Sequence, residues 1–188
     1  MKLLIVYGTS EGQTRKIAEF LQKEAEKAGI YAALCDATCN PINPEGYDGV
    51  MIGASMHMHK YQAAIEYYVK THMATLNDMP SAFFSVSLSA LSKDYDKESY
   101  QELTDLTDRF LIDTGWKPES TAFIAGALRY TQYDFFKKFI MRQIAKRGKG
   151  DTDTSHDHEY TDWNQVRSFL NDFMKTVKTR LTLTEEIL

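Results

Sequence analysis

Residues 3–14 read Leu-Leu-Ile-Val-Tyr-Gly-Thr-Ser-Glu-Gly-Gln-Thr. The first five are apolar without interruption, which is typical of a strand that is buried on both faces of a sheet. Gly8 ends this run. From Thr14 to Lys27 apolar side chains recur every three or four residues, as in an amphipathic helix. The stretch therefore predicts a strand, a short polar loop and a helix, which together form the first unit of a parallel α/β fold.

The rest of the chain repeats this alternation of apolar runs and helical periodicity. Four more runs have the composition of strands: residues 31–35, 49–54, 81–88 and 121–127. Helical spacing of apolar residues follows three of them, around residues 65–73, 103–111 and 166–177. Because strands separated by helices pair in parallel through right-handed crossovers, we expect a three-layer, doubly wound α/β domain with five strands.

Composition and charge limit the kind of protein. The chain has 188 residues, 43% hydrophobic and 26% charged, which excludes a disordered chain. No apolar run approaches the roughly 18 residues of a membrane-spanning helix. Two cysteines, Cys35 and Cys39, are too few for a disulfide framework or a four-cysteine metal site, and we expect no metal. A net charge of −4 gives no reason to expect a nucleic-acid partner. We predict a cytoplasmic protein with one domain over residues 1–180 and a tail over 181–188.

The loop after the first strand is the expected ligand site, because doubly wound sheets bind ligands beyond the carboxyl ends of their strands. Its glycines allow a tight turn, its hydroxyls can donate hydrogen bonds, and the following helix adds unpaired N–H groups. We therefore predict an anion cradle formed by Thr9, Ser10, Glu11, Gly12, Gln13 and Thr14.

The alternative for this loop is an ordinary helix N-cap, in which Thr9 or Ser10 caps the helix and Gln13 completes a capping box. The loop is neither a Walker A motif nor a dinucleotide fingerprint, since it lacks Gly-Lys-Ser/Thr and G-x-G-x-x-G.

Thr9-x-x-Gly12-x-Thr14 after a first strand resembles the phosphate loop of flavodoxins, which bind FMN. Further motifs resemble the menaquinone-dependent, oxygen-independent protoporphyrinogen IX dehydrogenases, which are flavodoxin-like enzymes of haem biosynthesis. These motifs are Gly53-Ala54-Ser55, Met79-Pro80-Ser81-Ala82-Phe83, Ile124-Ala125-Gly126-Ala127-Leu128-Arg129-Tyr130, Thr152-Asp153-Thr154 and Tyr160-Thr161-Asp162-Trp163. The resemblance implies a flavodoxin-like strand order of 2-1-3-4-5, FMN as cofactor, a porphyrinogen-like substrate and a quinone as electron acceptor.

Two further loops at the same sheet edge should then hold the flavin ring. The residues that we expect there are Ser55, Met56 and His57 after the third strand, and Val86, Ser87, Leu88 and Ser89 at the end of the fourth. The flavin itself would carry the chemistry, so no catalytic side chain is predicted. Residues 55–61 contain no glycine, so a peptide flip to positive φ would be costly there, and we expect a poorly stabilised semiquinone and a preference for two-electron chemistry.

A long segment, about 128–162, separates the last strand from the last helix, where such folds usually need about 2–6 residues. Residues 129–149 hold seven basic residues and one acid, and Phe136, Phe139, Ile140 and Ile144 recur with helical spacing. The cations that we expect to face substrate or membrane are Arg129, Lys137, Lys138 and Arg142. The segment either packs on its own domain or lies on an anionic membrane surface, which would make the protein peripheral on the inner face of the cell membrane.

Three functions stay open at this point. They are an FMN enzyme resembling protoporphyrinogen IX dehydrogenase, a flavodoxin-type electron carrier, and an FMN-dependent quinone reductase. Carriers are usually strongly acidic around the flavin, for steering to basic partners. A basic, aromatic segment beside the expected flavin site therefore favours the enzyme.

Overall fold

The computed structural model describes residues 1–39, 41–94, 96–128 and 158–185. Five parallel strands form one sheet in the order β2-β1-β3-β4-β5, which confirms the predicted flavodoxin-like topology. The strands are β1 (Lys2–Gly8), β2 (Tyr31–Asp36), β3 (Gly49–Ser55), β4 (Ser81–Ser87) and β5 (Ser120–Ala125). The order reverses at β1, which pairs with β2 on one side and β3 on the other. The loops after β1 and β3 therefore lead to opposite faces of the sheet, and doubly wound sheets bind their ligands at such a point.

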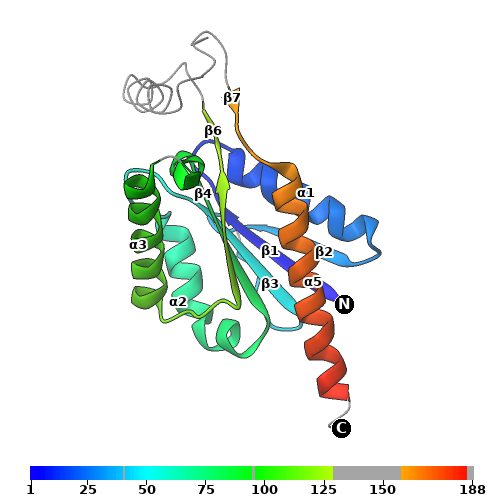
Figure 1. Cartoon of the computed structure of the whole chain (residues 1–188). Coiled ribbons are helices and arrows are strands. Elements are labelled where there is room, and N and C mark those ends of the chain that lie inside the picture. Colours follow the sequence, from blue (N-terminus) through cyan, green and yellow to red (C-terminus); the bar gives the residue numbers. More distant parts are fainter. Residues whose placement is uncertain (40, 95, 129–157, 186–188) are drawn as a thin grey trace.

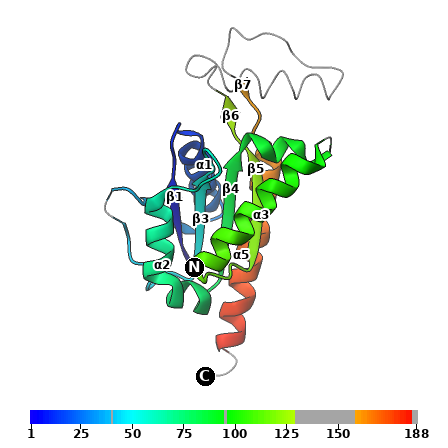
Figure 2. The same cartoon turned by 90° about the vertical axis from the view of Figure 1, so that its left-hand side faces the viewer.

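Helices cover both faces of the sheet (Figures 1 and 2). On one face lie α1 (Gln13–Lys27) and α5 (Trp163–Glu185), and on the other lie α2 (Ala63–Asp78) and α3 (Lys97–Thr114). Each pair of helices packs together as well as on the sheet. None of the helices among the described residues combines the length and the apolar character of a membrane span.

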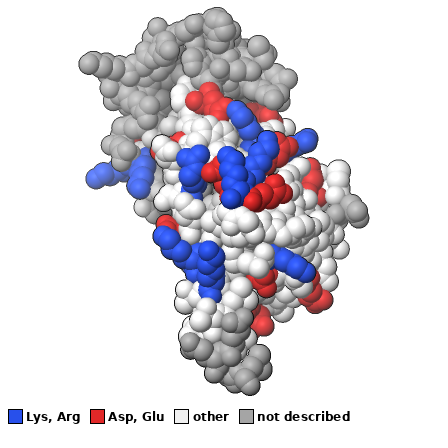
Figure 3. Space-filling model, turned by 90° about the vertical axis from the view of Figure 1, so that its right-hand side faces the viewer, with Lys and Arg blue, Asp and Glu red and all other residues white. Residues whose placement is uncertain are grey.

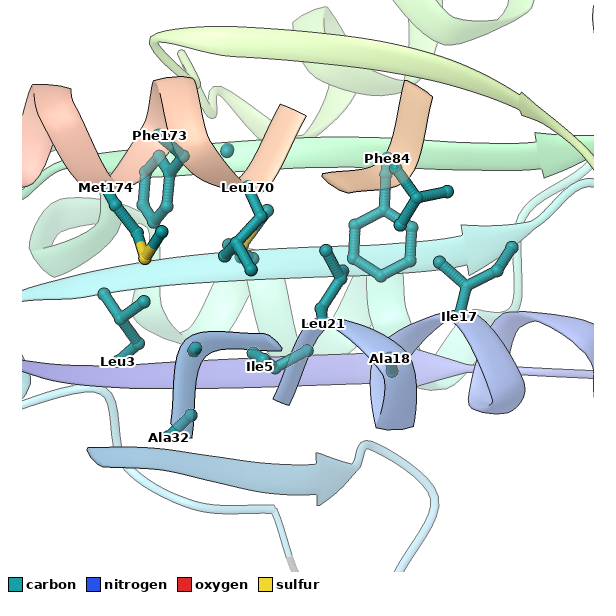
Figure 4. Packing of buried hydrophobic residues seen from close by; sticks show 14 of the residues in the cluster. Leu3, Ile5, Ile17, Ala18, Leu21, Ala32, Phe84, Leu170, Phe173 and Met174 are labelled. Carbon is teal, nitrogen blue, oxygen red and sulfur yellow. The ribbon is translucent and has the colours of Figure 1, made fainter. Parts of the chain in front are cut away.

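The unbroken apolar run of β1 has a direct structural reason. Leu3 and Ile5 point into the core beneath α1 and α5, where they meet residues such as Leu21 and Leu170 (Figure 4). Leu4 enters the second core, beneath α2 and α3. Because successive side chains of a strand alternate between faces and both faces are covered, every position of the run must be apolar.

Two strands end earlier than the sequence predicted. Strand four stops at Ser87 because Leu88 begins a 3-10 helix, η1 (Leu88–Asp94). Strand five stops at Ala125. The Gly126 N–H still donates to the Ser87 carbonyl at 3.2 Å, but the chain then leaves the sheet.

Beyond this point a second, two-stranded sheet forms at the carboxyl edge of the first. It pairs β6 (Ala127–Leu128) antiparallel with β7 (His158–Glu159). The long predicted segment thus follows strand five and begins and ends at this ribbon. At the other end of the chain, the tail expected from residue 181 starts inside α5, which continues to Glu185.

Candidate functional site

One glycine shapes the loop between β1 and α1. Gly12 has a φ of 91°, a left-handed conformation that strains a residue with a Cβ, and it is the N-cap of α1. Its N–H donates to Thr9 Oγ1 at 2.8 Å, and its carbonyl accepts from the Lys16 N–H at 3.1 Å. No side chain among the described residues caps the helix, so the capping alternative was wrong. The first amides of α1 are therefore available to an anion.

Thr14 gives the strongest structural indication of a ligand. Its side chain is fully buried, and its Oγ1 has no hydrogen-bond partner within the described part of the chain. Leaving a buried hydroxyl unsatisfied costs about 1–3 kcal/mol. Thr14 is the second residue of α1, beside the free amides of the helix terminus. An anion that bound those amides would also supply the acceptor that this hydroxyl lacks.

A side chain that the sequence analysis missed joins this loop to the next. Gln62 Nε2 donates to Ser10 Oγ at 3.1 Å and also to Ser55 Oγ, which in turn accepts from the Ser10 N–H at 3.3 Å. Gln62 is the N-cap of α2, and its Oε1 is buried without a partner in the residues that the structure describes. The only signal in the sequence was a polar residue just before the apolar stripe of that helix.

The loop after β3 contains a tight two-residue turn. His57 and Lys60 exchange both backbone hydrogen bonds, at 2.9 and 3.1 Å, and the two central residues, Met58 and His59, have φ values of 48° and 62°. The loop therefore adopts positive φ without a glycine, because a turn of this kind requires positive φ at both central positions. The expected preference for two-electron chemistry stays a prediction. His59 Nδ1 lies 3.1 Å from a carboxylate oxygen of Glu102, which ties the turn to α3.

The ends of β3 and β4 bring the other two predicted groups together. The Met56 N–H donates to the Val86 carbonyl at 2.9 Å. Ser87 follows, and its Oγ is buried without a partner among the described residues. Leu88 and Ser89 are half-buried at the start of η1. The strand ends that carry the residues expected to hold a flavin ring therefore lie next to each other at the carboxyl edge of the sheet. The Val86 side chain itself is buried in the core and is not free to contact a ligand.

Tyr61 anchors the loop after β3 from beneath. Its hydroxyl donates to Ser85 Oγ at 2.8 Å and lies 2.7 Å from Thr107 Oγ1, so it links the loop to β4 and α3. Its ring packs edge-on against Phe83 and Phe110. Burial raises the pKa of Tyr61 to about 12. The phenol therefore stays neutral at physiological pH and acts as a structural anchor.

Charges on the face formed by α1 and α5 are mixed (Figure 3). Arg167 and Lys27 both contact the carboxylate of Glu24, at 2.8 and 2.6 Å, and Arg15 contacts Glu19 at 2.8 Å. Paired exposed charges of this kind contribute little to stability. The predicted substrate- or membrane-facing cations, Arg129, Lys137, Lys138 and Arg142, lie outside the described residues.

Comparisons with known proteins agree with this arrangement. A family model described as flavodoxin domain matches residues 4–155. A protein of Escherichia coli (strain K12) named protoporphyrinogen IX dehydrogenase (quinone) is 39% identical over 173 residues, which cover 92% of this chain and 94% of that protein. One of the same name from Leishmania major is 34% identical over 174 residues, 92% of this chain and 74% of that protein.

Among solved structures, a short-chain flavodoxin associated with a non-canonical PDU bacterial microcompartment superposes with a TM-score of 0.57 at 10% identity. The match covers 94% of this chain and 99% of that one. At this identity the likeness concerns the fold alone.

Proposed function

Since the chain belongs to the flavodoxin-domain family and, within it, to the quinone-linked protoporphyrinogen IX dehydrogenases, we propose that it uses bound FMN to oxidise a porphyrinogen to a porphyrin and passes the electrons to a quinone. This reaction would serve haem biosynthesis, with a menaquinone-type acceptor. The domain implies a flavin, and the names of the relatives supply the classes of substrate and acceptor.

The buried hydroxyl of Thr14, which has no partner among the described residues, is the observation that favours FMN over a flavin without a phosphate. It stands beside the first amides of α1, which Gly12 leaves uncapped. A phosphate monoester offers three acceptor oxygens and negative charge, which suit a hydroxyl and a helix N-terminus. We assign Thr9, Ser10, Glu11, Gly12, Gln13 and Thr14 to this group. Glu11 contributes through its backbone amide, because its carboxylate would repel a phosphate. Gln13 also contributes through its backbone amide, because its side chain is hydrogen-bonded to Thr161.

The two neighbouring loops would hold the ring system. When bound, FMN supplies electron and hydride transfer at that ring. Met56, His57 and Leu88 are half-buried at the sheet edge and can cover its faces. Ser55 and Ser87 present hydroxyls at the ends of their strands, and Ser87 Oγ is without a partner in the described chain.

A direct assay tests the reaction. The flavin-loaded protein is incubated without oxygen with protoporphyrinogen IX and a menaquinone analogue, and porphyrin fluorescence is recorded. We expect porphyrin to form only when protein, flavin and quinone are all present. A rate no higher than that of free FMN would refute the substrate assignment and leave flavin binding to be measured separately.

We also propose that residues 129–149 bring the site to an anionic membrane surface. Two points support this: the quinone named for the relatives dissolves in the bilayer, and residues 129–149 follow directly on β6, at the edge that carries the site. Each cation at such a surface contributes up to about 1 kcal/mol. Sedimentation with anionic vesicles should recover the protein at low salt, less at high salt, and less when Lys137, Lys138 and Arg142 are changed to Gln. Equal recovery with neutral vesicles, or none with either, would refute this role.

A further inference from the structure

One sequence motif, Tyr160-Thr161-Asp162-Trp163, has no place in the site described so far. Thr161 lies between β7 and α5 and is 9% exposed. Its hydroxyl donates to the Ala125 carbonyl, at the end of β5, at 2.7 Å. The same oxygen accepts from Gln13 Nε2 at 2.8 Å. Thr161 therefore connects the carboxyl end of β5, the outermost strand of the sheet, to Gln13, the first residue of α1.

The residues around Thr161 follow the surface of α1. The Tyr160 N–H donates to the Gly126 carbonyl at 3.1 Å. Lys16, one turn after Gln13, forms an ion pair with Glu159 and places its ammonium group 5.5 Å from the centre of the Trp163 ring. Trp163 also packs against Phe20, with ring centres 4.8 Å apart. The segment that leads into α5 thus runs beside the first turns of α1 (Figure 1).

We propose that Thr161 is a positioning residue of the phosphate site. The Gln13 side chain starts at the first residue of the helix, next to Thr14 and the uncapped amides. Held by Thr161, this side chain fixes the first turn and stays away from those amides. Released, the side chain no longer fixes the first turn, and the turn loses its preorganisation.

This inference rests on the proposed binding of FMN, and it predicts an effect on one part of the flavin only. Thr161 acts through the amides and the hydroxyl that face the phosphate. It should therefore change the affinity for FMN and leave the affinity for riboflavin, which has no phosphate, unaltered. A general loss of packing would weaken both ligands alike, so the ratio of the two affinities separates positioning from structural damage.

The test measures the dissociation constants of both flavins by quenching of their fluorescence. Thr161→Val keeps the shape of the side chain and removes the hydroxyl. It should weaken FMN binding about two- to tenfold, the range that corresponds to one neutral hydrogen bond, without weakening riboflavin binding. Thr161→Ser should bind FMN as the wild type does. Gln13→Met should reproduce the loss, and the double variant should lose no more than the larger single one, because both remove the same contact.

The matched control is Thr114→Val. Thr114 is also buried, and its hydroxyl also donates to a backbone carbonyl at 2.8 Å, that of Phe110, but it lies at the far end of α3. It should leave both affinities unchanged. The positioning role of Thr161 would be overturned if Thr161→Val left the ratio of the FMN and riboflavin affinities unaltered, or if the losses in the double variant were additive. Either result would leave the phosphate site itself standing. A wild type that binds riboflavin as tightly as FMN would instead overturn the phosphate site itself.

Discussion

Replacing Thr14 by valine should have opposite effects on the free protein and on its complex with FMN. Valine has nearly the shape of threonine and lacks the hydroxyl. In the structure that hydroxyl is fully buried and has no partner among the described residues. An unsatisfied buried group of this kind costs about 1–3 kcal/mol. The flavin-free variant should therefore be more stable than the wild type, by about 1 kcal/mol or more.

The complex should respond in the other direction. A hydrogen bond from the Thr14 hydroxyl to a phosphate dianion contributes about 1.5–3 kcal/mol. Its loss should weaken FMN binding about ten- to a hundredfold. Riboflavin binding should stay as it is.

Two measurements check this prediction: urea unfolding of the flavin-free protein, and titration of FMN fluorescence. Thr114→Val is again the control, because its hydroxyl does have a partner. It should lose about 0.5–1.5 kcal/mol of stability and bind FMN normally. An anion-binding role for Thr14 is refuted if Thr14→Val destabilises the flavin-free protein as Thr114→Val does, or if its affinity for FMN is unchanged.

Three further changes have outcomes that the structure specifies. The raised pKa of Tyr61, about 12 against an ordinary 10, means that the unfolded chain releases this proton first as the pH rises. Urea unfolding should therefore show stability falling above about pH 10, by about 2 kcal/mol from Tyr61 at pH 12, and Tyr61→Phe should make that fall shallower. Gly53→Ala should cost about 1–3 kcal/mol, because a Cβ there would lie 2.0 Å from the buried Phe84 ring. Gly126→Ala is the steric comparison, because a Cβ there would have its nearest neighbour at 3.4 Å and the backbone has no positive φ. Gly12→Ala should lower stability by about 1–2 kcal/mol and weaken FMN binding, since φ is 91°; thermal unfolding with and without FMN would contradict this if both midpoints matched the wild type.

The sequence by itself determined the order of elements and the position of the first loop. The unbroken run at residues 3–7 required a strand that is covered on both faces, and the helical spacing between strands required parallel pairing. Glycines and hydroxyls at positions 8–14 marked the anion cradle, because these features depend on neighbours along the chain. The motifs between residues 9 and 163 indicated the family, because each of them is also a short run of neighbouring residues.

Tertiary structure decided which groups act together across long separations. Gln62 reaches Ser10, 52 positions away, and Thr161 reaches Gln13, 148 positions away. Neither contact leaves a periodic or spacing signal, because a side-chain amide or hydroxyl can serve many partners. The positive φ values in the loop after β3 were also not apparent from the sequence. The turn there contains no glycine and is closed by backbone hydrogen bonds between His57 and Lys60. Local patterns fix strands and helices, whereas the direction of a polar side chain depends on what the folded chain places beside it.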